Sequence, residues 1–540
     1  MAKLSWLLLA AVAALAVGGL PGGGPAAADA ANILVVISMP APSHLNVFTA
    51  LTRALAERGH QITLVSPMRK DYKMHPTKNH VIVSVQDDAV DKHKEKSVEN
   101  FLSGKKKNFI VEMTEFFQWG EQLCRTTLTH PNFKAEVLKP GVKYDLVINE
   151  AFFLQESLVA LGHKLGAPVI AVNPFGASPF INDIMGNPMN PAYTPNLFLG
   201  LPDSMTAPQR WLNLFAATVM KAMYWNIQLR GQQRIVEEFF PDAPHLLELL
   251  RSQLALTLVN NHYTLGYPVP LAPGVVEIGG IQITDKPKPL PKDLKEYMDG
   301  AKEGVVYFSM GSNLRMEFLP KETMEAIFGA LGSVKERVLM KWDGPVPAKG
   351  VPKNIKIVDW APQNDILAHA NLRVFVTHGG LLSSQEAIYH AVPLVAIPVF
   401  ADQEFNTQMA KQKGFAEVVS FKTLTEAELS QALKTVLASP SYKEAAGRLS
   451  SLFRAQPQRP ADVAVYWVEH VLQYGGAHLR PASVDLHLSQ IMFLDLAAVV
   501  LVSVLLLALA ARALCRCCCG GGRAKSAGED KKKSKGKKNQ

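Results

Sequence analysis

The sequence has few cysteines, and most of them lie together near one end. Of five cysteines in 540 residues, only Cys124 lies in the body of the chain, and the others are Cys515, Cys517, Cys518 and Cys519. A lone thiol cannot form an internal disulfide, and the sequence contains no N-x-S/T acceptor for N-linked glycosylation. These absences exclude a small disulfide-stapled module, so the body of the chain must rely on hydrophobic cores. Its length predicts two such cores.

Long apolar runs are also scarce, and both lie at the ends of the chain. Residues 7–20 follow a basic start at Lys3 and precede the small residues PAAADA. This pattern is typical of a secretory signal peptide, which we place at residues 1–30, with a membrane-spanning anchor as the alternative. The second run, residues 491–511, has Asp495 as its one charged residue and is long enough to cross a bilayer.

The body of the chain lacks an excess of positive charge. Residues 512–540 carry a net charge of +8 out of +9 for the whole chain, so a basic nucleic-acid-binding face is excluded. By the positive-inside rule this tail is cytoplasmic and the body, from residue 31 to about 488, is luminal. The final residues KKNQ resemble a dilysine retrieval signal, which predicts a single-pass type I protein of the endoplasmic reticulum membrane. The four clustered cysteines suit palmitoylation better than metal binding.

Strand and helix patterns alternate through the luminal part. NILVVIS, QITLVS, YDLVINE and APVIAVN read as buried strands with helical stretches between them, and the same alternation resumes after the Pro- and Lys-rich segment TDKPKPLPKDL. We therefore expect an N-terminal domain at residues 31–283, a linker at 284–300, a second domain at 301–475 and a juxtamembrane segment at 476–490. Ligands bind at the carboxyl ends of strands in such sheets, so the site is expected between the domains. The dinucleotide motif G-x-G-x-x-G is absent from the luminal part, which argues against a hydride-transferring enzyme.

One segment, THGGLLSSQEA, combines features that suit a nucleotide sugar. His378 and the glycine pair ending at Gly380 lie between a strand and a helix, where free N–H groups and the helix dipole favour a phosphate. Glu386 lies two turns along the helix and suits a ribose. Upstream, WAPQ supplies Trp360 as an aromatic face for a base. The remaining polar candidates are Gln363, Asp402 and Gln403.

These residues together resemble the signature of the UDP-glycosyltransferases, membrane-bound detoxification enzymes of animals with soluble relatives in plants. The resemblance extends to YFSMGS (307–312) and GGAHLRPASVDL (475–486), and it is greatest for the insect branch. It implies an α/β fold of GT-B type, with two doubly wound Rossmann-like domains facing an interdomain cleft and one C-terminal transmembrane helix. The donor-binding residues that it implies are Ser309, Gly311, Ser312, Trp360, Ala361, Gln363, His378, Gly380, Ser383, Glu386, Asp402 and Gln403.

The resemblance also places the catalytic groups in the N-terminal domain. His44 in MPAPSHLN stands where the family carries its catalytic base, and Glu150 in INEAFF stands where many relatives carry the Asp that orients it. Many relatives have Asn in place of Leu382, so Ser383 and backbone N–H groups are expected to carry more of the phosphate contact.

The implied reaction is an inverting transfer of a hexose, with glucose favoured, from a UDP-sugar to a hydroxyl group of a small lipophilic acceptor. No metal or other cofactor is expected, and the sequence has no Asp-x-Asp pair, which argues against a metal-dependent glycosyltransferase. The alternative is a non-catalytic, membrane-anchored protein of the same fold that binds a nucleotide sugar or a lipophile. The sequence leaves the acceptor, the sugar and homo-oligomer formation open.

Each candidate has a structural alternative. His378 and Asp402 could cap helices, Trp360 could be a core aromatic, Glu386 a solvated helix residue and His44 a surface histidine. The stretch from Phe175 to Trp225 is rich in Met, Phe and Pro. It predicts either an apolar acceptor pocket or membrane-contacting surface, or simply a packed helix with an irregular loop.

Overall fold

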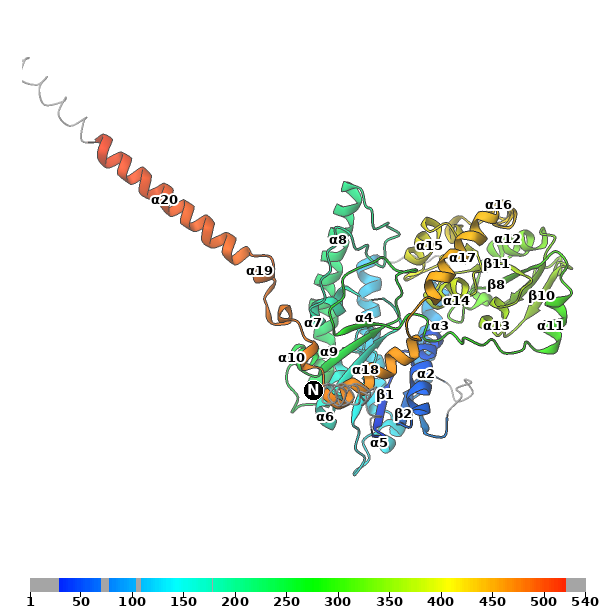
Figure 1. Ribbon diagram of the computed structural model, residues 1–540, viewed down its shortest axis with the longest axis horizontal. Helices are drawn as coiled ribbons and strands as arrows, with labels where there is room; N and C mark the ends of the chain where they lie inside the picture. The colour runs from blue at the N-terminus through cyan, green and yellow to red at the C-terminus, as the bar shows by residue number, and fades with distance from the viewer. Residues whose placement is uncertain (1–28, 69–76, 103–107, 177, 521–540) are drawn as a thin grey trace, which may run out of the picture. The chain divides into compact units, whose positions relative to one another are not determined.

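The computed structural model (Figure 1) describes residues 29–68, 77–102, 108–176 and 178–520. The chain divides into one unit up to Pro481, which holds two sheets, and a second unit from Ala482 onward. All but the last two residues of the expected signal peptide, and residues 521–540 of the expected tail, lie outside the described residues.

The N-terminal sheet has seven strands in the described part of the chain, all of them parallel, in the order β3-β2-β1-β4-β5-β6-β7. The strands expected from the sequence are confirmed at β1, β2, β4 and β5. The patterns that we used did not identify β3, β6 or β7. The strands are β1 (Asn32–Val36), β2 (Gln61–Ser66), β3 (His80–Ser84), β4 (Leu146–Asn149), β5 (Val169–Asn173), β6 (Leu254–Val259) and β7 (Val275–Glu277).

The second sheet has six parallel strands among the described residues, in the order β10-β9-β8-β11-β12-β13. The resumed alternation predicts five of them, from the runs GVVYFSMGS, ERVLMKWD, IKIVDWAP, RVFVTHGG and PLVAIPV, and it did not identify β13. The strands are β8 (Val305–Ser309), β9 (Arg337–Lys341), β10 (Ile355–Val358), β11 (Leu372–Thr377), β12 (Leu394–Ala396) and β13 (Ala416–Val418).

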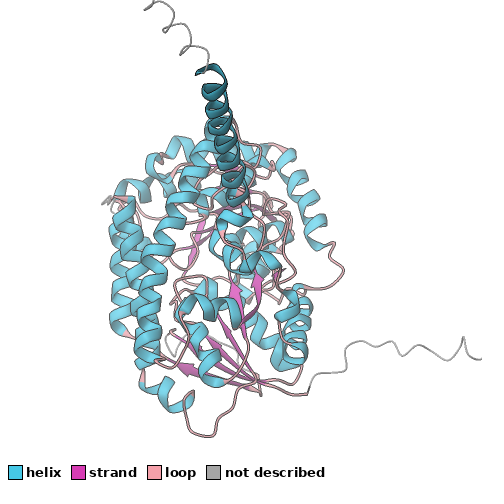
Figure 2. Ribbon diagram, turned by 90° about the vertical axis from the view of Figure 1, so that its left-hand side faces the viewer, coloured by secondary structure: helices cyan, strands magenta, loops and turns pink. Residues whose placement is uncertain are grey.

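Helices cover both faces of each sheet, and Figure 2 shows the strands enclosed by helices. The helices of the first domain are α2 (Pro42–Glu57), α3 (Asp88–Leu102), α4 (Phe109–Thr129), α5 (Pro131–Glu136), η1 (Glu156–Val159), α6 (Ala160–Leu165), α7 (Pro179–Met185), α8 (Ala207–Met223), η2 (Tyr224–Gln228), α9 (Leu229–Phe239) and α10 (Leu246–Ser252). Those that follow are α11 (Lys292–Asp299), η3 (Met316–Phe318), α12 (Lys321–Gly332), α13 (Gln363–Leu367), α14 (Leu381–Tyr389), α15 (Gln403–Gln412), η4 (Phe421–Thr423), α16 (Glu426–Ala438), α17 (Pro440–Arg454), α18 (Pro460–Tyr474) and η5 (Ala477–Leu479).

Alternate residues of the central strands enter different cores, as the two-residue period of a strand requires. In β1, Leu34 packs in one apolar cluster and Val35 in another on the opposite face. In β8, Phe308 and Tyr307 divide between two further clusters in the same way. Continuous apolar strands are therefore explained by burial on both faces.

Both sheets reverse their strand order at the same place. The first strand of each sheet lies between the second and the fourth, so the reversal falls between β1 and β4 in one sheet and between β8 and β11 in the other. The loops that leave such a strand pair at its carboxyl end form the usual ligand site of this topology. His44 and Glu150 follow β1 and β4, whereas Gly311 and His378 follow β8 and β11.

Two segments depart from the simple expectation of two domains joined by a structureless linker. The expected linker at 284–300 contains α11 in its second half, because the prolines of this segment end at Pro291 and a helix can follow. The last helix of the expected second domain, α18, packs against α2 and β6 of the first sheet. In Figure 1, α18 accordingly lies among elements of the first domain.

The second unit contains η6 (Ala482–Asp485), α19 (Leu488–Ile491) and α20 (Leu494–Gly520). Residues Leu494–Cys518 of α20 form one helix, within the described residues, that is long and apolar enough to cross a membrane. This helix overlaps the expected span at 491–511 and extends beyond it, because Arg512 and Arg516 do not interrupt the helical backbone.

Candidate active site

The sequence around His44 places it in the first turn of α2. Pro42 starts the helix, because its fixed φ and missing N–H suit that position. Leu45 and Phe48 then bury one face of the helix in the core of the first sheet. His44 is thereby held at the carboxyl end of β1, and only 5% of the residue is exposed. This burial argues against the alternative of a simple surface histidine.

The structure brings together the two residues expected to form the catalytic pair. Nδ1 of His44 lies 2.5 Å from Oε1 of Glu150, and Glu150 is completely buried. A carboxylate can only accept, so Nδ1 carries the proton and donates to it. The Nε2 atom of His44 has no hydrogen bond to any described residue, and it is the nitrogen available to a ligand.

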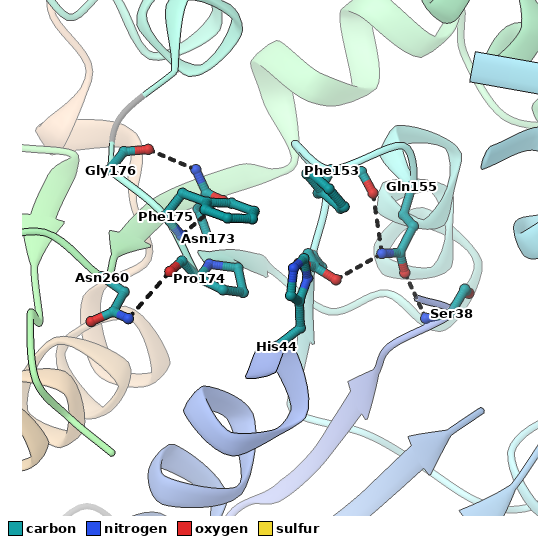
Figure 3. A network of polar contacts seen from close by, with 10 residues as sticks. Ser38, His44, Phe153, Gln155, Asn173, Pro174, Phe175, Gly176 and Asn260 are labelled. Atoms are coloured by element: carbon teal, nitrogen blue, oxygen red, sulfur yellow. Dashed lines mark hydrogen bonds and ion pairs between the residues drawn. The ribbon is translucent and has the colours of Figure 1, made fainter. Parts of the chain in front are cut away.

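Aromatic rings surround His44 (Figure 3). The ring of Phe153 lies 4.8 Å from the imidazole and that of Phe175 lies 5.0 Å away, both edge to face. Phe116 extends the group at 5.8 Å from Phe153. Phe153 was not among the expected site residues, although the pair of phenylalanines shortly after Glu150 was the available signal.

At the second sheet, two glycines bring the backbone close to His378. A Cβ atom added at Gly311 would lie 2.7 Å from the imidazole, and one at Gly380 would lie 2.6 Å from it. Gly311 has a φ of +79°, a conformation that favours glycine. Gly380 precedes the first turn of α14, whose first N–H groups have no partners within the helix.

Electrostatics at this point favour an anion. Burial, and then the charge of Lys341, lower the pKa of His378 to about 4, so this histidine is neutral at pH 7. The ammonium group of Lys341 donates to the carbonyl of Gly311 at 2.8 Å. Lys341 was not among the expected site residues, because it ends β9 without any surrounding motif.

Gln363, Ser383 and Glu386 form one connected group. Nε2 of Gln363 donates to Oε2 of Glu386 at 2.8 Å and to the hydroxyl of Ser383 at 3.1 Å. Burial raises the pKa of Glu386 to about 7, against the opposing effect of the Gln363 hydrogen bond. Glu386 is therefore a half-buried, paired carboxyl rather than a solvated helix residue. Trp360, three residues before Gln363, is 63% exposed, which argues against a core aromatic.

Asp402 is tied to the glycine segment through Asn406. Nδ2 of Asn406 donates to Oδ2 of Asp402 at 2.7 Å and to the carbonyl of Gly379 at 3.2 Å. Asp402 stands at the N-cap position of α15, but its side chain makes no capping hydrogen bond. Gln403 accepts the N–H groups of Val399 and Phe400 through Oε1, which fixes the loop after β12.

Three expected donor residues differ in their exposure. Ser309 is buried, and its hydroxyl accepts the N–H of Gly311 at 3.3 Å, so it supports the loop from inside. Ser312 is exposed, and Ala361 is buried with a side chain that has no polar atom.

The two domains that carry these residues contact each other between α14 and the segment after β6. Nε2 of Gln385 in α14 donates to the carbonyl and to Oδ1 of Asn260, both at 3.2 Å. Burial raises the pKa of Asp402, and hydrogen bonds from Asn406 and from the backbone oppose this effect. Leu382 packs against the core of the first domain, which explains an apolar residue at this position.

The stretch from Phe175 to Trp225 divides into parts with different surroundings. Its first residue, Phe175, contacts His44, as described above. Further along, α8 exposes Trp211, Leu212 and Phe215, while Asn213 on the same helix is completely buried. The stretch is therefore neither one continuous pocket wall nor one fully packed helix.

Two doubly wound parallel sheets, with a buried His–Glu pair after the strands of one and a glycine-lined loop after those of the other, define a glycosyltransferase fold of the GT-B class. The family described as UDP-glucoronosyl and UDP-glucosyl transferase matches residues 32–530. The chain belongs to this family and is an animal-type UDP-glycosyltransferase.

Curated relatives agree with this assignment. UDP-glycosyltransferase UGT5 of Dactylopius coccus is 35% identical over 486 residues, covering 88% of this chain and 90% of the relative. UDP-glucuronosyltransferase 2A3 of Cavia porcellus is 32% identical over 488 residues, covering 86% and 88%. The human 2-hydroxyacylsphingosine 1-beta-galactosyltransferase is 30% identical over 486 residues, covering 88% and 86%.

Solved structures show the same fold at lower identity. CalG4, the calicheamicin glycosyltransferase, has a TM-score of 0.54 and 18% identity, and the match covers 83% of this chain and 99% of that protein. The spinosyn forosaminyltransferase SpnP has a TM-score of 0.55 and 18% identity, covering 82% and 99%.

Proposed function

We propose that this protein transfers a hexose, with glucose favoured, from a UDP-sugar to a hydroxyl group of a small lipophilic acceptor. The observation that carries the proposal is the 2.5 Å contact between Nδ1 of His44 and the buried carboxylate of Glu150. This contact occupies Nδ1 of the imidazole and leaves Nε2 available to a ligand. A histidine held in one tautomer by a carboxylate is suited to act as a general base.

The donor is proposed to lie along the second domain. Trp360 offers an exposed face to uracil, and Gln363 and Glu386 offer paired polar groups to the ribose. His378, Gly380, Ser383 and the first N–H groups of α14 face the diphosphate. Asp402 and Gln403 complete the set near the sugar.

In the proposed reaction, Nε2 of His44 removes the proton of the acceptor hydroxyl while its oxygen attacks the anomeric carbon. The bond between that carbon and the diphosphate oxygen breaks, UDP leaves, and the configuration inverts. The N-terminus of α14 and the ammonium group of Lys341 stabilise the charge that grows on the leaving diphosphate. The scheme requires no metal.

The acceptor class follows from the surroundings of His44. Phe153, Phe175 and Phe116 form an aromatic group next to the base, and an apolar ring packs well against such edges. A planar phenol is therefore the first acceptor to test. The names of the relatives include glucosyl-, glucuronosyl- and galactosyltransferases, so the donor screen should contain all three UDP-sugars.

We place the protein in the endoplasmic reticulum membrane, with the catalytic part luminal and the basic tail cytoplasmic. The apolar helix Leu494–Cys518 and the basic residues that follow it support this orientation. Protease treatment of sealed microsomes should remove a C-terminal tag and spare the body of the chain. Loss of the body under these conditions would overturn the topology.

Sugar transfer from UDP-glucose to a planar phenol by microsomes that express the full chain tests the function. We expect His44→Ala to lower kcat about 10²- to 10⁴-fold, the usual contribution of a general base. His163→Ala, at an exposed histidine of the same domain, is the matched control and should leave the rate unchanged. Stabilisation by UDP-sugar without any transfer would instead favour the non-catalytic binding protein.

A further inference from the structure

Both carboxylate oxygens of Glu150 have a partner, and only one of those partners is His44. Oε2 of Glu150 accepts a hydrogen bond from Nε2 of Gln155 at 2.9 Å. Gln155 is completely buried and was not among the residues singled out by motif. Its amide therefore lies on the opposite side of the carboxylate from the imidazole.

The orientation of this amide is fixed by the first strand. Oε1 of Gln155 accepts the N–H of Ser38, two residues after β1, at 2.6 Å. Figure 3 shows this contact together with the hydrogen bond from Nε2 of Gln155 to the carbonyl of Phe153. An amide oxygen that accepts from a backbone N–H leaves its NH₂ group to point the other way. Gln155 can therefore only donate to Glu150, and donation to a carboxylate favours the ionised form.

The backbone that presents Gln155 is in an unusual conformation. Leu154 has a φ of +68°, which residues with a Cβ rarely adopt. Helix α4 approaches this turn so closely that a Cβ added at Gly120 would lie 2.5 Å from Cβ of Leu154. Outliers of this kind persist only where the surroundings hold them, and they gather at functional sites.

A second buried glutamine holds this turn from α9. Nε2 of Gln232 donates to the carbonyl of Leu154 at 2.9 Å, and its Oε1 accepts the N–H of Ser157 at 3.0 Å. These contacts lie on either side of Gln155 along the chain. Gln155 is thus fixed by its own hydrogen bonds and by its neighbours.

We propose that Gln155 is a positioning residue that holds the carboxylate of Glu150 aligned toward His44, so that a Gln–Glu–His chain rather than a pair sets the base. The inference rests on the proposed role of His44. Gln155 touches neither the acceptor nor the donor in this scheme, and it acts through Glu150 alone. Its substitution should therefore affect kcat and the pH profile but not donor binding.

The test compares Gln155→Leu with Asn213→Leu in the full chain. Asn213 is an equally buried amide with three hydrogen bonds, to Pro191, Thr194 and Asn196, which lie apart from Glu150 in the sequence and make no contact with it among those described. For Gln155→Leu we expect kcat to fall roughly 10- to 100-fold, as for other partners that orient a catalytic group. KM for the UDP-sugar should stay within about twofold, and the acidic limb of the kcat/KM profile should move. Asn213→Leu should leave the acidic limb in place, and it should lower kcat no more than a reduced amount of folded protein explains.

A proton NMR readout separates this inference from the proposed function. The downfield imidazole N–H signal that disappears in His44→Ala reports the contact with Glu150 whether or not sugar is transferred. We expect Gln155→Leu to shift or broaden this signal and Asn213→Leu to leave it in place. An unchanged signal and pH profile in folded Gln155→Leu would overturn the inference. A shifted signal in a protein whose transfer rate does not depend on His44 would support the positioning role of Gln155 but contradict the proposed function.

Discussion

The loops at the strand-order reversals of the two sheets occupy equivalent places and have opposite character. In the first domain, the loop after β4 contains no glycine between Glu150 and Ser157, and it turns at Leu154 with a φ of +68°. In the second domain, the corresponding turns use Gly311 and Gly379, with φ values of +79° and +78°. The first loop is built from buried side chains, and the second exposes its backbone.

This difference matches two chemical tasks. A general base must have one protonation state and one direction, so its partners are buried and each of their polar atoms is matched. A diphosphate is bound by N–H groups and helix ends, so side chains must be small where the backbone approaches it. Under the proposed function, the same strand order supports a rigid base on one sheet and an open anion site on the other.

Removing the charge of Glu150 is expected to have the largest effect on the difference between the two loops. Glu150→Gln keeps the size of the side chain but cannot stabilise an imidazolium, so we expect kcat to fall about 10²- to 10⁴-fold. UDP affinity, measured by calorimetry, should remain within about twofold because that site lies on the other sheet. Glu156→Gln is the matched control, since Glu156 is also buried and pairs with Gln228 instead of His44. Equal losses in both variants would show that burial of the carboxyl, not its place beside His44, matters.

A second substitution adds a side chain to the glycine-containing loop of the second domain. A Cβ in Gly380→Ala would lie 2.6 Å from Nε2 of His378 and would displace the ring. Overpacking of this kind costs about 1–3 kcal/mol, so we expect UDP affinity to fall roughly 10- to 100-fold. Gly447→Ala in α17 is the control, because nothing lies within 4 Å of an added Cβ there. Unchanged UDP binding by Gly380→Ala would place the diphosphate elsewhere.

The same contrast explains what could be read from the sequence. Apolar runs that are buried on both faces are visible locally, and they identified β1, β2, β4 and β5, whereas the short edge strands β7 and β13 have only three residues each. The interior strand β6 was missed although it is buried throughout. His44 and Glu150 followed from a family resemblance. Gln155 could not, since its role depends on the N–H of Ser38, 117 residues earlier, and on the turn at Leu154.

The candidate site residues of the second domain were easier to predict because several of them lie close together in the sequence. Gly380, Ser383 and Glu386 fall within one strand-loop-helix segment, and their spacing carries the signal. Lys341 was missed because it comes from a neighbouring strand and reaches Gly311 only in the folded chain. Ser309 was expected to face the diphosphate, and its burial beneath Gly311 depends on side-chain packing that spacing does not reveal.

Two exposed tryptophans, one in each domain, test where the uracil base of UDP stacks. Trp360 of the second domain is 63% exposed and Trp211 of the first is 72% exposed. Stacking on a base contributes about 1–3 kcal/mol, so Trp360→Ala should weaken UDP binding roughly tenfold. Trp211→Ala should not change it, and neither variant should change binding of inorganic diphosphate. A loss of diphosphate binding in Trp360→Ala would mean that the loop, rather than the ring, had been altered.

The smallest expected effect compares one carboxyl in each domain, the buried Glu156 and the half-buried Glu386. Burial raises the pKa of Glu156 in the first domain and of Glu386 in the second to about 7, from an ordinary value of 4.5. A raised pKa in the folded state means that the stabilisation is complete below about pH 4.5 and is lost as the pH rises through 7. For Glu156 the slope cannot exceed about 1.4 kcal/mol per pH unit, the value for one proton.

Thermal unfolding between pH 4.5 and 8 should therefore become less pH-dependent in Glu156→Gln and in Glu386→Gln. Saturating UDP separates the two carboxyls, because only Glu386 is proposed to face the ligand. We expect UDP to change the pH dependence that Glu386 contributes and to leave that of Glu156 intact. If UDP altered both contributions equally, the ligand would be acting on the whole chain, and the division of tasks between the two sheets would have to be abandoned.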